Sequence, residues 1–434
     1  MPEDVRTGQL IHDWNRAEDE FRPARPVMLD DETLRDGLQS PSVTDPPIEK
    51  KLRLLHLMDG LGIDTANVGL PGAGERQVRD VTALCGEIVA AGLKIRPNCA
   101  ARTVIRDIEP IARISQDVGI PIESCLFIGS SPIRQYTEGW TINDILKHTE
   151  EAITWAVGEG LPVMFVTEDT TRAAPEALRR LYMTAIASGA KRLCVADTVG
   201  HATPEGATRL VGFVRNLVEE SGEDVGIDWH GHRDRGLDVA NCLAAVRAGA
   251  TRIHGAGIGI GERAGNAPME LLLVNLKLLG WIDRDLTKLA EYCHSVSEAC
   301  RVPIPTNYPV VGSDAFETAT GVHAAAVIKA YRLGDAWLAD RIYSSVPATE
   351  FGLSQRIRVG PMSGHSNVIW WLEKNGYEAT AERVDQVYQA AKVATRLLED
   401  AEIHAILREV SGRSPHGVSG SFACRGGVAP ACCP

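Results

Sequence analysis

The sequence predicts an α/β fold, a (β/α)8 TIM barrel followed by a mainly helical C-terminal region. From residue 26 onward, short apolar runs typical of strands alternate with helix-length segments whose apolar residues recur with a helical period. Eight such strand–helix pairs follow one another without interruption and span the roughly 250 residues that a barrel of this kind needs. No G-x-G-x-x-G motif follows the first run, which disfavours the alternative, a doubly wound open sheet.

The predicted barrel elements can be placed in order along the chain. The runs predicted as strands are residues 26–30, 63–68, 93–96, 122–128, 163–167, 192–196, 225–229 and 252–254. Between them, residues 48–61, 146–157 and 237–248 have the apolar spacing of helices. Thr203 followed by Pro204 indicates a helix start, with Thr203 as the N-cap and Pro204 at the first helical position.

The alternation stops after residue 285. Residues 286–302 and 383–410 still have helical patterns, and an irregular stretch containing Pro and Gly separates them. We therefore expect four regions: an N-terminal extension (1–25), the catalytic barrel (26–285), helical C-terminal subdomains (286–410) and a flexible tail (411–434).

The composition restricts the class of protein. Of the 434 residues, 44% are hydrophobic and 24% are charged, as is typical of a soluble globular protein. The net charge of -12 disfavours nucleic acid and anionic membrane surfaces as partners. No apolar run reaches the roughly 18 residues of a membrane helix, and the first residues lack the features of a signal peptide, so we expect a cytoplasmic protein.

The cysteines are interpreted as free thiols. Seven of them stand singly among apolar residues, as small core residues do, and no zinc-type pair of C-x-x-C motifs is present. The three cysteines after residue 420 lie in a segment rich in Gly and Ser, and we interpret them as incidental thiols of the tail.

Polar side chains gather where five of the predicted strands end. In barrels of this architecture, catalytic groups lie at the carboxyl ends of the strands and in the loops that follow. The polar segments are residues 30–39, 167–169, 197–198, 230–234 and 262–266. We therefore expect them to surround one active site.

Two histidines give the sharpest physical signal among these segments. Residues i and i+2 of a strand face the same side, so His230 and His232 can reach one metal ion. Asp36 could add a carboxylate oxygen and leave positions open for a substrate. The alternative is a pair of structural histidines at a strand end, and the acidic and basic groups on the neighbouring strand ends favour the metal site.

The same segments resemble the signatures of the DRE-TIM metallolyases. Residues 31–37 with Gln39 are similar to D-x-T-L-R-D-G-x-Q, and residues 230–241 are similar to H-x-H-N-D-x-G-L-x-V-A-N. Residues 259–266 match the G-I-G-E-R-A-G-N stretch of the condensing branch, which comprises the 2-isopropylmalate, citramalate and homocitrate synthases. Further matches lie at residues 131–133, 168–172, 197–200 and 320–323, so that the resemblance covers about residues 27–370.

The resemblance implies a metal site and its ligands. Asp36, His230, His232 and Asn266 would hold a divalent metal ion, to which a 2-oxo acid binds. The ion acts as a Lewis acid on the keto group of that acid. This set of ligands suits magnesium, manganese, zinc or cobalt, so the native metal stays open. Taken alone, Asn266 could instead cap the helix after the eighth strand.

The resemblance also implies the catalytic groups. Arg35 would stabilise the alkoxide that develops on the keto oxygen, and Thr198 would hydrogen-bond the substrate carboxylate. Glu168 and His323 match the pair implicated in removing a proton from the methyl group of acetyl-CoA, the co-substrate. The enolate then attacks the keto carbon, and water hydrolyses the thioester. In the family this histidine comes from the partner subunit, so a homodimer is expected.

Each of these residues also has a structural interpretation. Arg35 and Asp36 could form a structural ion pair, and Glu168 could be paired with Arg172. His323 lies in a run of small and apolar residues, so it could be a core histidine.

Several positions depart from the pattern of the condensing branch. Asn67, Arg134 and Arg233 replace its usual Glu, His and Asn, and residues 324–326 are Ala-Ala-Ala in place of Gln-Asp-Gly. Leu38 makes the form Arg-Asp-Gly-Leu-Gln, which is seen in the 3-hydroxy-3-methylglutaryl-CoA lyases. A carbon–carbon lyase is therefore the alternative function, and a non-catalytic paralogue is a third. The G-E-R-A-G-N stretch, which those lyases lack, favours condensation.

The sequence thus predicts an acyl-CoA:2-oxo acid C-acyltransferase of the 2-alkylmalate synthase type. The predicted substrate-binding residues are Thr198, Gln39, Arg134, Arg233 and Asn67. Arg134 and Arg233, with Arg96 at the end of the third predicted strand, would need a second anion to offset their desolvation. This favours an acceptor with a second acidic group, such as oxaloacetate, 2-oxoglutarate or phosphonopyruvate. The alternative is that these arginines face solvent, pair with acidic neighbours such as Asp234 or contact the phosphates of CoA.

Overall fold

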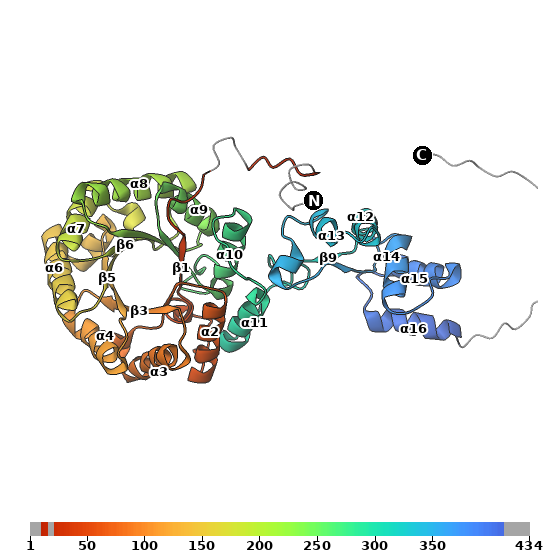
Figure 1. Ribbon diagram of the computed structural model, residues 1–434, viewed down its shortest axis with the longest axis horizontal. Helices are drawn as coiled ribbons and strands as arrows, with labels where there is room; N and C mark the ends of the chain where they lie inside the picture. Colours follow the sequence, from red (N-terminus) through yellow and green to blue (C-terminus); the bar gives the residue numbers. More distant parts are fainter. Residues whose placement is uncertain (1–9, 16–20, 412–434) are drawn as a thin grey trace, which may run out of the picture. The chain divides into compact units, whose positions relative to one another are not determined.

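The computed structural model describes residues 10–15 and 21–411, and its chain forms two compact units. The first unit contains the chain as far as residue 315 together with residues 346–354. The second contains residues 316–345 and the described chain from residue 355 to residue 411. Figure 1 labels the elements of both units.

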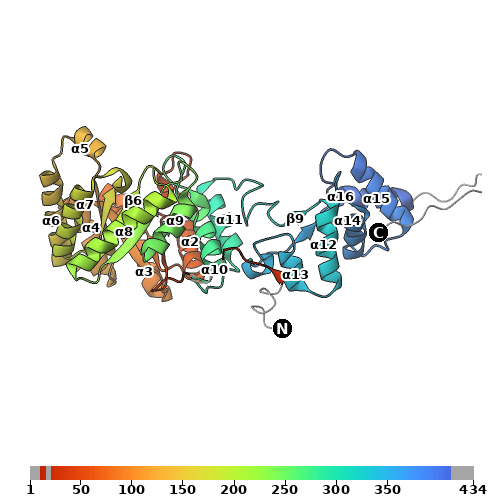
Figure 2. The ribbon, with the colours of Figure 1, turned by 90° about the horizontal axis from the view of Figure 1, so that it is seen from above.

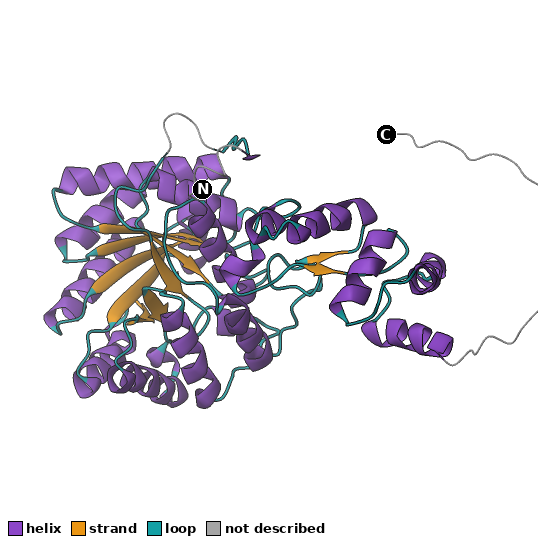
Figure 3. Ribbon diagram, turned by 45° about the vertical axis from the view of Figure 1, so that its right-hand side comes forward, coloured by secondary structure: helices purple, strands orange, loops and turns teal. Residues whose placement is uncertain are grey.

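The first unit is a closed barrel of parallel strands, which confirms the predicted fold class. Its strands pair in chain order, and β1 pairs with β8 through Leu29 and Ile253 to close the ring. Figure 3 shows the strands enclosed by helices. The strands are β1 (Met28–Asp31), β2 (Thr65–Asn67), β3 (Arg96–Arg102), β4 (Glu123–Gly129), β5 (Val163–Glu168), β6 (Arg192–Asp197), β7 (Gly226–Gly231) and β8 (Arg252–Gly255).

Helices cover the outside of the barrel (Figures 1 and 2). Thr203 caps α8 as predicted, because its hydroxyl accepts a hydrogen bond from the backbone N–H of Gly206 at 3.2 Å. No helix in the described part of the chain is long and apolar enough to cross a membrane. The main helices are α2 (Ile48–Gly60), α3 (Glu75–Ala91), α4 (Ile105–Val118), α5 (Pro132–Glu138), α6 (Ile142–Gly158), α7 (Pro175–Ala187), α8 (Pro204–Ser221), α9 (Asp238–Ala248), α10 (Met269–Leu278) and α11 (Leu289–Cys300).

The third strand differs from its prediction. Residues 93–96 were expected to form it, but β3 begins at Arg96 and ends at Arg102. The strand was placed too early because residues 97–101 are small or polar, although all five are buried between β2 and β4. Arg96 therefore lies at the amino end of the strand, which is the end of the barrel opposite to the predicted site.

The first unit extends past the expected boundary at residue 285. Helix α11 packs on α2 and belongs to the barrel unit. The hydroxyl of Tyr292 on this helix donates to Oδ2 of Asp31 at 2.5 Å, and both residues are buried. The seven cysteines of the described residues are all buried and unpaired, as predicted.

The second unit is mainly helical and also contains a parallel pair of short strands, β9 (Glu317–Thr318) and β10 (Arg356–Ile357). Residues 383–410 do not form one continuous helical segment: the backbone of Ala394 is extended, and Leu398 donates to the carbonyl of Val359 at 2.9 Å. Of the expected tail, Ser411 ends the last helix, and residues 412–434 lie outside the described residues. The helices are α12 (Gly321–Arg332), α13 (Ala336–Arg341), α14 (His365–Lys374), α15 (Ala381–Val393) and α16 (Asp400–Ser411).

Candidate active site

The carboxyl ends of the barrel strands surround a pocket that contains most of the predicted site residues. Its walls also include apolar side chains, among them Phe127 and Val166. Eight of the predicted site residues line it: Arg35, Asp36, Gln39, Asn67, Glu168, Thr198, His230 and His232. This end of a barrel is where enzymes of the architecture hold their active sites.

Asp36, His230 and His232 form a compact buried cluster in this pocket. His230 lies near the end of β7 and His232 follows it, so both imidazoles can face the same carboxylate. Oδ2 of Asp36 is 3.2 Å from Nε2 of His230 and 3.4 Å from Nε2 of His232. The two Nε2 atoms are 3.4 Å apart. Three atoms that can ligate a metal therefore converge.

Asn266 lies next to this cluster along the backbone, where it forms an isolated antiparallel bridge with His232. Its Nδ2 donates to the carbonyl of Ile260 at 3.1 Å, whereas its Oδ1 is buried without a hydrogen-bond partner. The turn requires glycine at position 261, where an added Cβ would collide with the Asn266 amide. Asn266 does not cap the following helix, because Pro268 is at the cap position of α10.

The charge states of the cluster fit a divalent metal ion. Burial lowers the pKa of His230 and so favours the neutral imidazole. Burial opposes ionisation of Asp36, but the Arg35 guanidinium, 3.8 Å away, and the two imidazoles hold the pKa of this carboxyl well below its usual value. Two imidazole nitrogens, one carboxylate oxygen and one unpaired amide oxygen are ligands that zinc, manganese, cobalt or magnesium accept.

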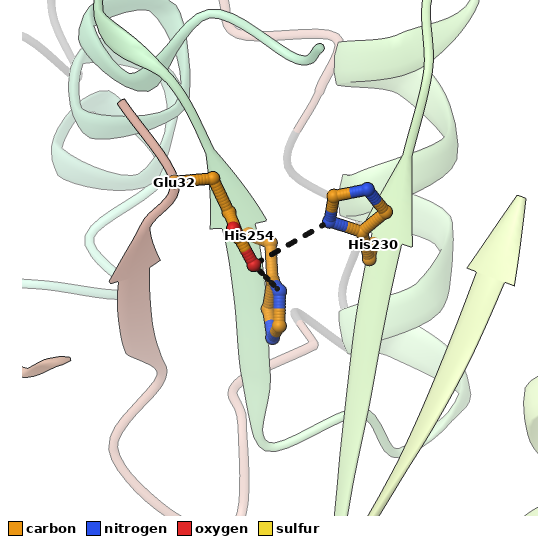
Figure 4. A group of neighbouring side chains, drawn as sticks. All are labelled: Glu32, His230 and His254. Atoms are coloured by element: carbon orange, nitrogen blue, oxygen red, sulfur yellow. Dashed lines mark hydrogen bonds and ion pairs between the residues drawn. The ribbon is translucent and has the colours of Figure 1, made fainter. Parts of the chain in front are cut away.

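A second buried cluster on the other side of His230 was not expected from the sequence. Oε1 of Glu32 lies 3.1 Å from Nδ1 of His254 and 3.8 Å from Nδ1 of His230 (Figure 4). Oε2 of Glu32 forms an ion pair with Arg35 at 2.7 Å. The signal available in the sequence was an acidic residue within the Arg35–Asp36 motif, together with a histidine inside the eighth predicted strand.

The charges in this second cluster stabilise one another. Burial opposes ionisation of Glu32, but Arg35 and His254 hold its pKa at about 2. Burial also opposes a charge on His254, yet Asp30, Asp228 and Glu32 raise its pKa to about 9. The neighbouring charges therefore favour the carboxylate form of Glu32 and the imidazolium form of His254.

Glu168 ends β5 and lines the pocket with a partly exposed carboxylate. Burial raises the pKa of Glu168, and the Arg134 guanidinium, 4.0 Å away, opposes this rise. Arg134 also pairs with Glu138 at 3.1 Å. Glu168 is not the partner of Arg172, which instead binds Asp169 through two hydrogen bonds of 2.7 Å.

Three other predicted substrate contacts line the pocket with polar atoms. Oγ1 of Thr198 accepts a hydrogen bond from the backbone N–H of Asp169 at 2.8 Å, so its own proton can be donated elsewhere. Oε1 of Gln39 is 3.5 Å from Nη1 of Arg35. Asn67 is 1% exposed, and neither its Oδ1 nor its Nδ2 has a hydrogen-bond partner.

The arginines are arranged differently from the prediction. Nε of Arg233 donates to the backbone carbonyl of Ala264 at 2.8 Å, so this residue holds the loop after β8 and does not line the pocket. Arg263 lines the pocket instead and pairs with Asp234, at 2.8 Å through Nε. Arg96 is at the opposite end of its strand, as described above.

His323 lies on α12 in the second unit, whereas all other predicted site residues belong to the first. It is exposed, not a core residue, and its ring stacks on Tyr343 with the ring centroids 4.1 Å apart. The sequence pattern did not point to Tyr343.

Fold and site together define a TIM-barrel protein with a candidate Asp–His–His–Asn metal centre at the mouth of the barrel. Residues 26–296 match the family described as HMGL-like, and the chain belongs to this family, the DRE-TIM metallolyases.

Relatives with assigned functions resemble the chain over most of its length. It is 35% identical over 390 residues to Homocitrate synthase AksA of Methanopyrus kandleri, a match that covers 88% of this chain and 92% of that protein. It is 35% identical to a probable 2-isopropylmalate synthase of the same organism, covering 90% of this chain and 74% of the relative. It is 31% identical to (R)-citramalate synthase CimA of Methanocaldococcus jannaschii, a match that covers 89% of this chain and 75% of that protein.

Solved structures with a similar fold include 3-hydroxy-3-methylglutaryl-CoA (HMG-CoA) lyases. The lyase of Pseudomonas aeruginosa has a TM-score of 0.53 and 19% sequence identity, covering 64% of this chain and 94% of that structure. The lyase of Brucella melitensis has a TM-score of 0.53 and 17% sequence identity, and the match covers 63% of this chain and 99% of that structure. At these identities the likeness concerns the fold.

Proposed function

We propose that the protein condenses acetyl-CoA with a 2-oxo acid and hydrolyses the resulting thioester to a 2-substituted malate. The observation that carries this proposal is the convergence of Asp36, His230 and His232 beside Arg35 in one pocket. The names of the relatives, which are homocitrate, isopropylmalate and citramalate synthases, support the same reaction.

The residues of the pocket can divide the work of the first step. A divalent ion held by Asp36, His230, His232 and Asn266 would supply Lewis-acid polarisation of the keto group when bound. Arg35 donates hydrogen bonds to the oxygen on which negative charge develops, and burial makes this contact stronger than in water. Thr198 donates its free hydroxyl proton to the carboxylate of the 2-oxo acid.

Glu168 and His323 handle the proton of the acetyl methyl group in this proposal. A carboxylate with a raised pKa is a stronger base than an ordinary glutamate, and Glu168 has this property because its partial burial disfavours the charged form. His323 would complete the site from the partner subunit of a homodimer. Tyr343, stacked on it, would fix the plane of the imidazole.

Mixed dimers test this shared site. His323→Ala and Glu168→Gln should each be nearly inactive alone. If the two variants are mixed and their subunits exchange at random, about half of the dimers are heterodimers, and each heterodimer contains one intact site of two. About a quarter of the wild-type activity should therefore return. If exchange is shown by mass spectrometry and no activity returns, the two residues do not act across subunits.

We further propose an acceptor whose second group is acidic or polar. Arg233 does not line the pocket, but Asn67 does, and both atoms of its buried amide lack hydrogen-bond partners at the pocket wall. A branched apolar substrate would leave that amide unpaired, which costs binding free energy. A second carboxylate or phosphonate would accept its hydrogen bond instead.

A panel of acceptors separates these possibilities. A thiol reagent measures the release of CoA from acetyl-CoA in the presence of one acceptor at a time. The acceptors are oxaloacetate, 2-oxoglutarate, phosphonopyruvate, pyruvate and 2-oxoisovalerate. The proposal expects the highest kcat/KM for a substrate with a second acidic group and a shift toward 2-oxoisovalerate in Asn67→Leu. A preference for 2-oxoisovalerate or pyruvate in the wild type would contradict it. Cleavage of HMG-CoA without condensation would identify a lyase, and neither reaction would indicate a non-catalytic paralogue.

A further inference from the structure

The side of His230 that faces away from Asp36 holds a second group of metal-ligating residue types. Figure 4 shows Glu32 between His230 and His254, with its carboxylate directed at both rings. Oε1 of Glu32 lies 3.8 Å from Nδ1 of His230 and 3.1 Å from Nδ1 of His254. Glu32 directly follows β1, His230 is in β7 and His254 is in β8, and these strands become neighbours only in the closed barrel.

This group is closed to a second ion, because its atoms are already engaged. Oε2 of Glu32 faces Arg35 at 2.7 Å, and Oε1 faces His254. The other nitrogen of His254, Nε2, is 2.9 Å from Oδ2 of Asp228, which also accepts from Nε of Arg252 at 2.5 Å. An imidazole with carboxylates at both nitrogens donates from both and has no lone pair to offer a metal.

We propose that Glu32 and His254 are positioning residues for the active site. The carboxylate of Glu32 faces Nδ1 of His230 at 3.8 Å, an electrostatic contact that favours the tautomer with its proton on Nδ1 and so leaves Nε2 directed toward Asp36 and His232. The same carboxylate holds the guanidinium of Arg35. His254 fixes Glu32 in turn and connects it to Asp228, in the rigid interior of the barrel. This positioning role rests on the proposed function, because it requires His230 to be a ligand of a metal ion.

One carboxylate therefore couples two parts of the catalytic apparatus. A carboxylate that faces the outer nitrogen of a ligating histidine fixes the tautomer and the orientation of the ring, and mutation of such an outer partner typically weakens metal binding by about 10–100-fold. Loss of the ion pair frees the Arg35 side chain to leave the position where it meets the developing charge. Both effects should appear when Glu32 is neutralised without a change in its shape.

The test compares metal affinity in full-length variants. Apo-protein is titrated with zinc in competition with a chromophoric chelator, and metal content is measured by elemental analysis. The wild type should bind one ion per chain, and Glu32→Gln should bind it about 10–100-fold more weakly. Glu270→Gln is the matched control. Glu270 is equally buried, but its carboxylate accepts from Tyr308 and from the backbone N–H of Ile258, not from residues of the metal cluster.

Two substitutions of His254 separate its two contacts. In His254→Asn the side-chain amide can replace Nδ1 and still donate to Glu32, whereas in His254→Gln it can replace Nε2 and donate only to Asp228. We expect the Gln variant to lose metal affinity as Glu32→Gln does and the Asn variant to lose less. The metal affinities of both variants are measured at temperatures where circular dichroism shows that the protein is folded, so that unfolding does not affect them.

Turnover gives a second readout. At saturating zinc, kcat of Glu32→Gln should remain below the wild-type value because Arg35 is released, while KM for acetyl-CoA should be unchanged.

Each outcome has a definite meaning. Metal affinity and kcat of Glu32→Gln within twofold of the wild type would overturn the positioning role and leave the proposed function intact. Two ions per chain in the wild type and one in Glu32→Gln would show a second metal site in its place. A wild type that binds no divalent ion would overturn the proposed function itself.

Discussion

The barrel contains two polar regions that use the same residue types but pair them differently. Deep in the barrel lies a group that we call the interior ionic layer, where opposite charges face each other at short distances. Arg252 donates to Asp228 at 2.5 Å and to Glu123 at 2.6 Å. The members of the interior ionic layer are Asp30, Glu123, Arg192, Asp228, Arg252 and His254.

At the mouth of the barrel, by contrast, several buried polar atoms have neither a hydrogen bond nor an ion pair. They include both amide atoms of Asn67, Oδ1 of Asn266 and Nδ1 of His232. A buried polar atom without a hydrogen bond costs free energy, so few native proteins retain several in one place unless a ligand satisfies them. We therefore infer that the interior ionic layer stabilises the fold and that the mouth of the barrel binds a ligand. Glu32 connects the two regions.

The largest expected effect is at the mouth. His232→Ala should lose metal binding and turnover together, because it removes one of the converging Nε2 atoms. Its unfolding midpoint without metal should stay close to that of the wild-type apo-protein. Elemental analysis, the CoA-release assay and a thermal melt measure the three quantities. His294→Ala on the exposed face of α11 is the control, and full activity of His232→Ala in a strong chelator would remove the metal from the proposal.

A substitution in the same pocket but outside the metal cluster should be almost as damaging. Glu168→Gln should reduce kcat by roughly 10²–10⁴-fold, the usual contribution of a general base, with metal content unchanged. Calorimetric titration should still detect binding of the 2-oxo acid. Glu138→Gln, which alters the other carboxylate beside Arg134, should stay within a few-fold of the wild type. An equal loss in both variants would mean that Glu168 acts only through the local charge.

The interior ionic layer should respond in stability. Arg252→Met leaves the buried Asp228 and the half-buried Glu123 with fewer cationic partners, and breaking a buried pair typically costs about 3–5 kcal/mol. Urea unfolding at pH 7 measures this loss. Arg179→Met, which breaks the exposed pair with Glu220, should leave the midpoint nearly unchanged. Similar midpoints for the two variants would contradict the distinction between the regions.

The smallest effect is a shift in pH dependence. Burial raises the pKa of Glu168, and Arg134 opposes that rise, so Arg134→Met should raise the pKa further. Because a base must be ionised to act, activity is lost as the pH falls through this pKa, and the acid limb of kcat/KM should move to higher pH. Arg134→Lys, which keeps the charge, should retain the wild-type limb. A limb that moves to lower pH in Arg134→Met would contradict the sign.

Residues close in sequence account for the features that could be predicted. The pairing of His230 with His232 follows from the two-residue period of a strand, and apolar runs located most of the strands. The third strand was misplaced because its buried residues include Pro97, Asn98 and Cys99, which do not form an apolar run. Small and polar residues at the buried positions of this strand weaken the hydrophobic signal on which strand prediction depends.

The sequence by itself determined the barrel class, the histidine pair and the motif that contains Arg35 and Asp36, since each is written in residues a few positions apart. Only the tertiary structure decided that Arg263 lines the pocket and Arg233 does not. The loop after β8 folds back on Arg233, whose Nε donates to the carbonyl of Ala264. The tertiary structure also decided that Glu32 meets His254. These residues are more than two hundred positions apart, and they meet because β1 hydrogen-bonds to β8 when the sheet closes on itself.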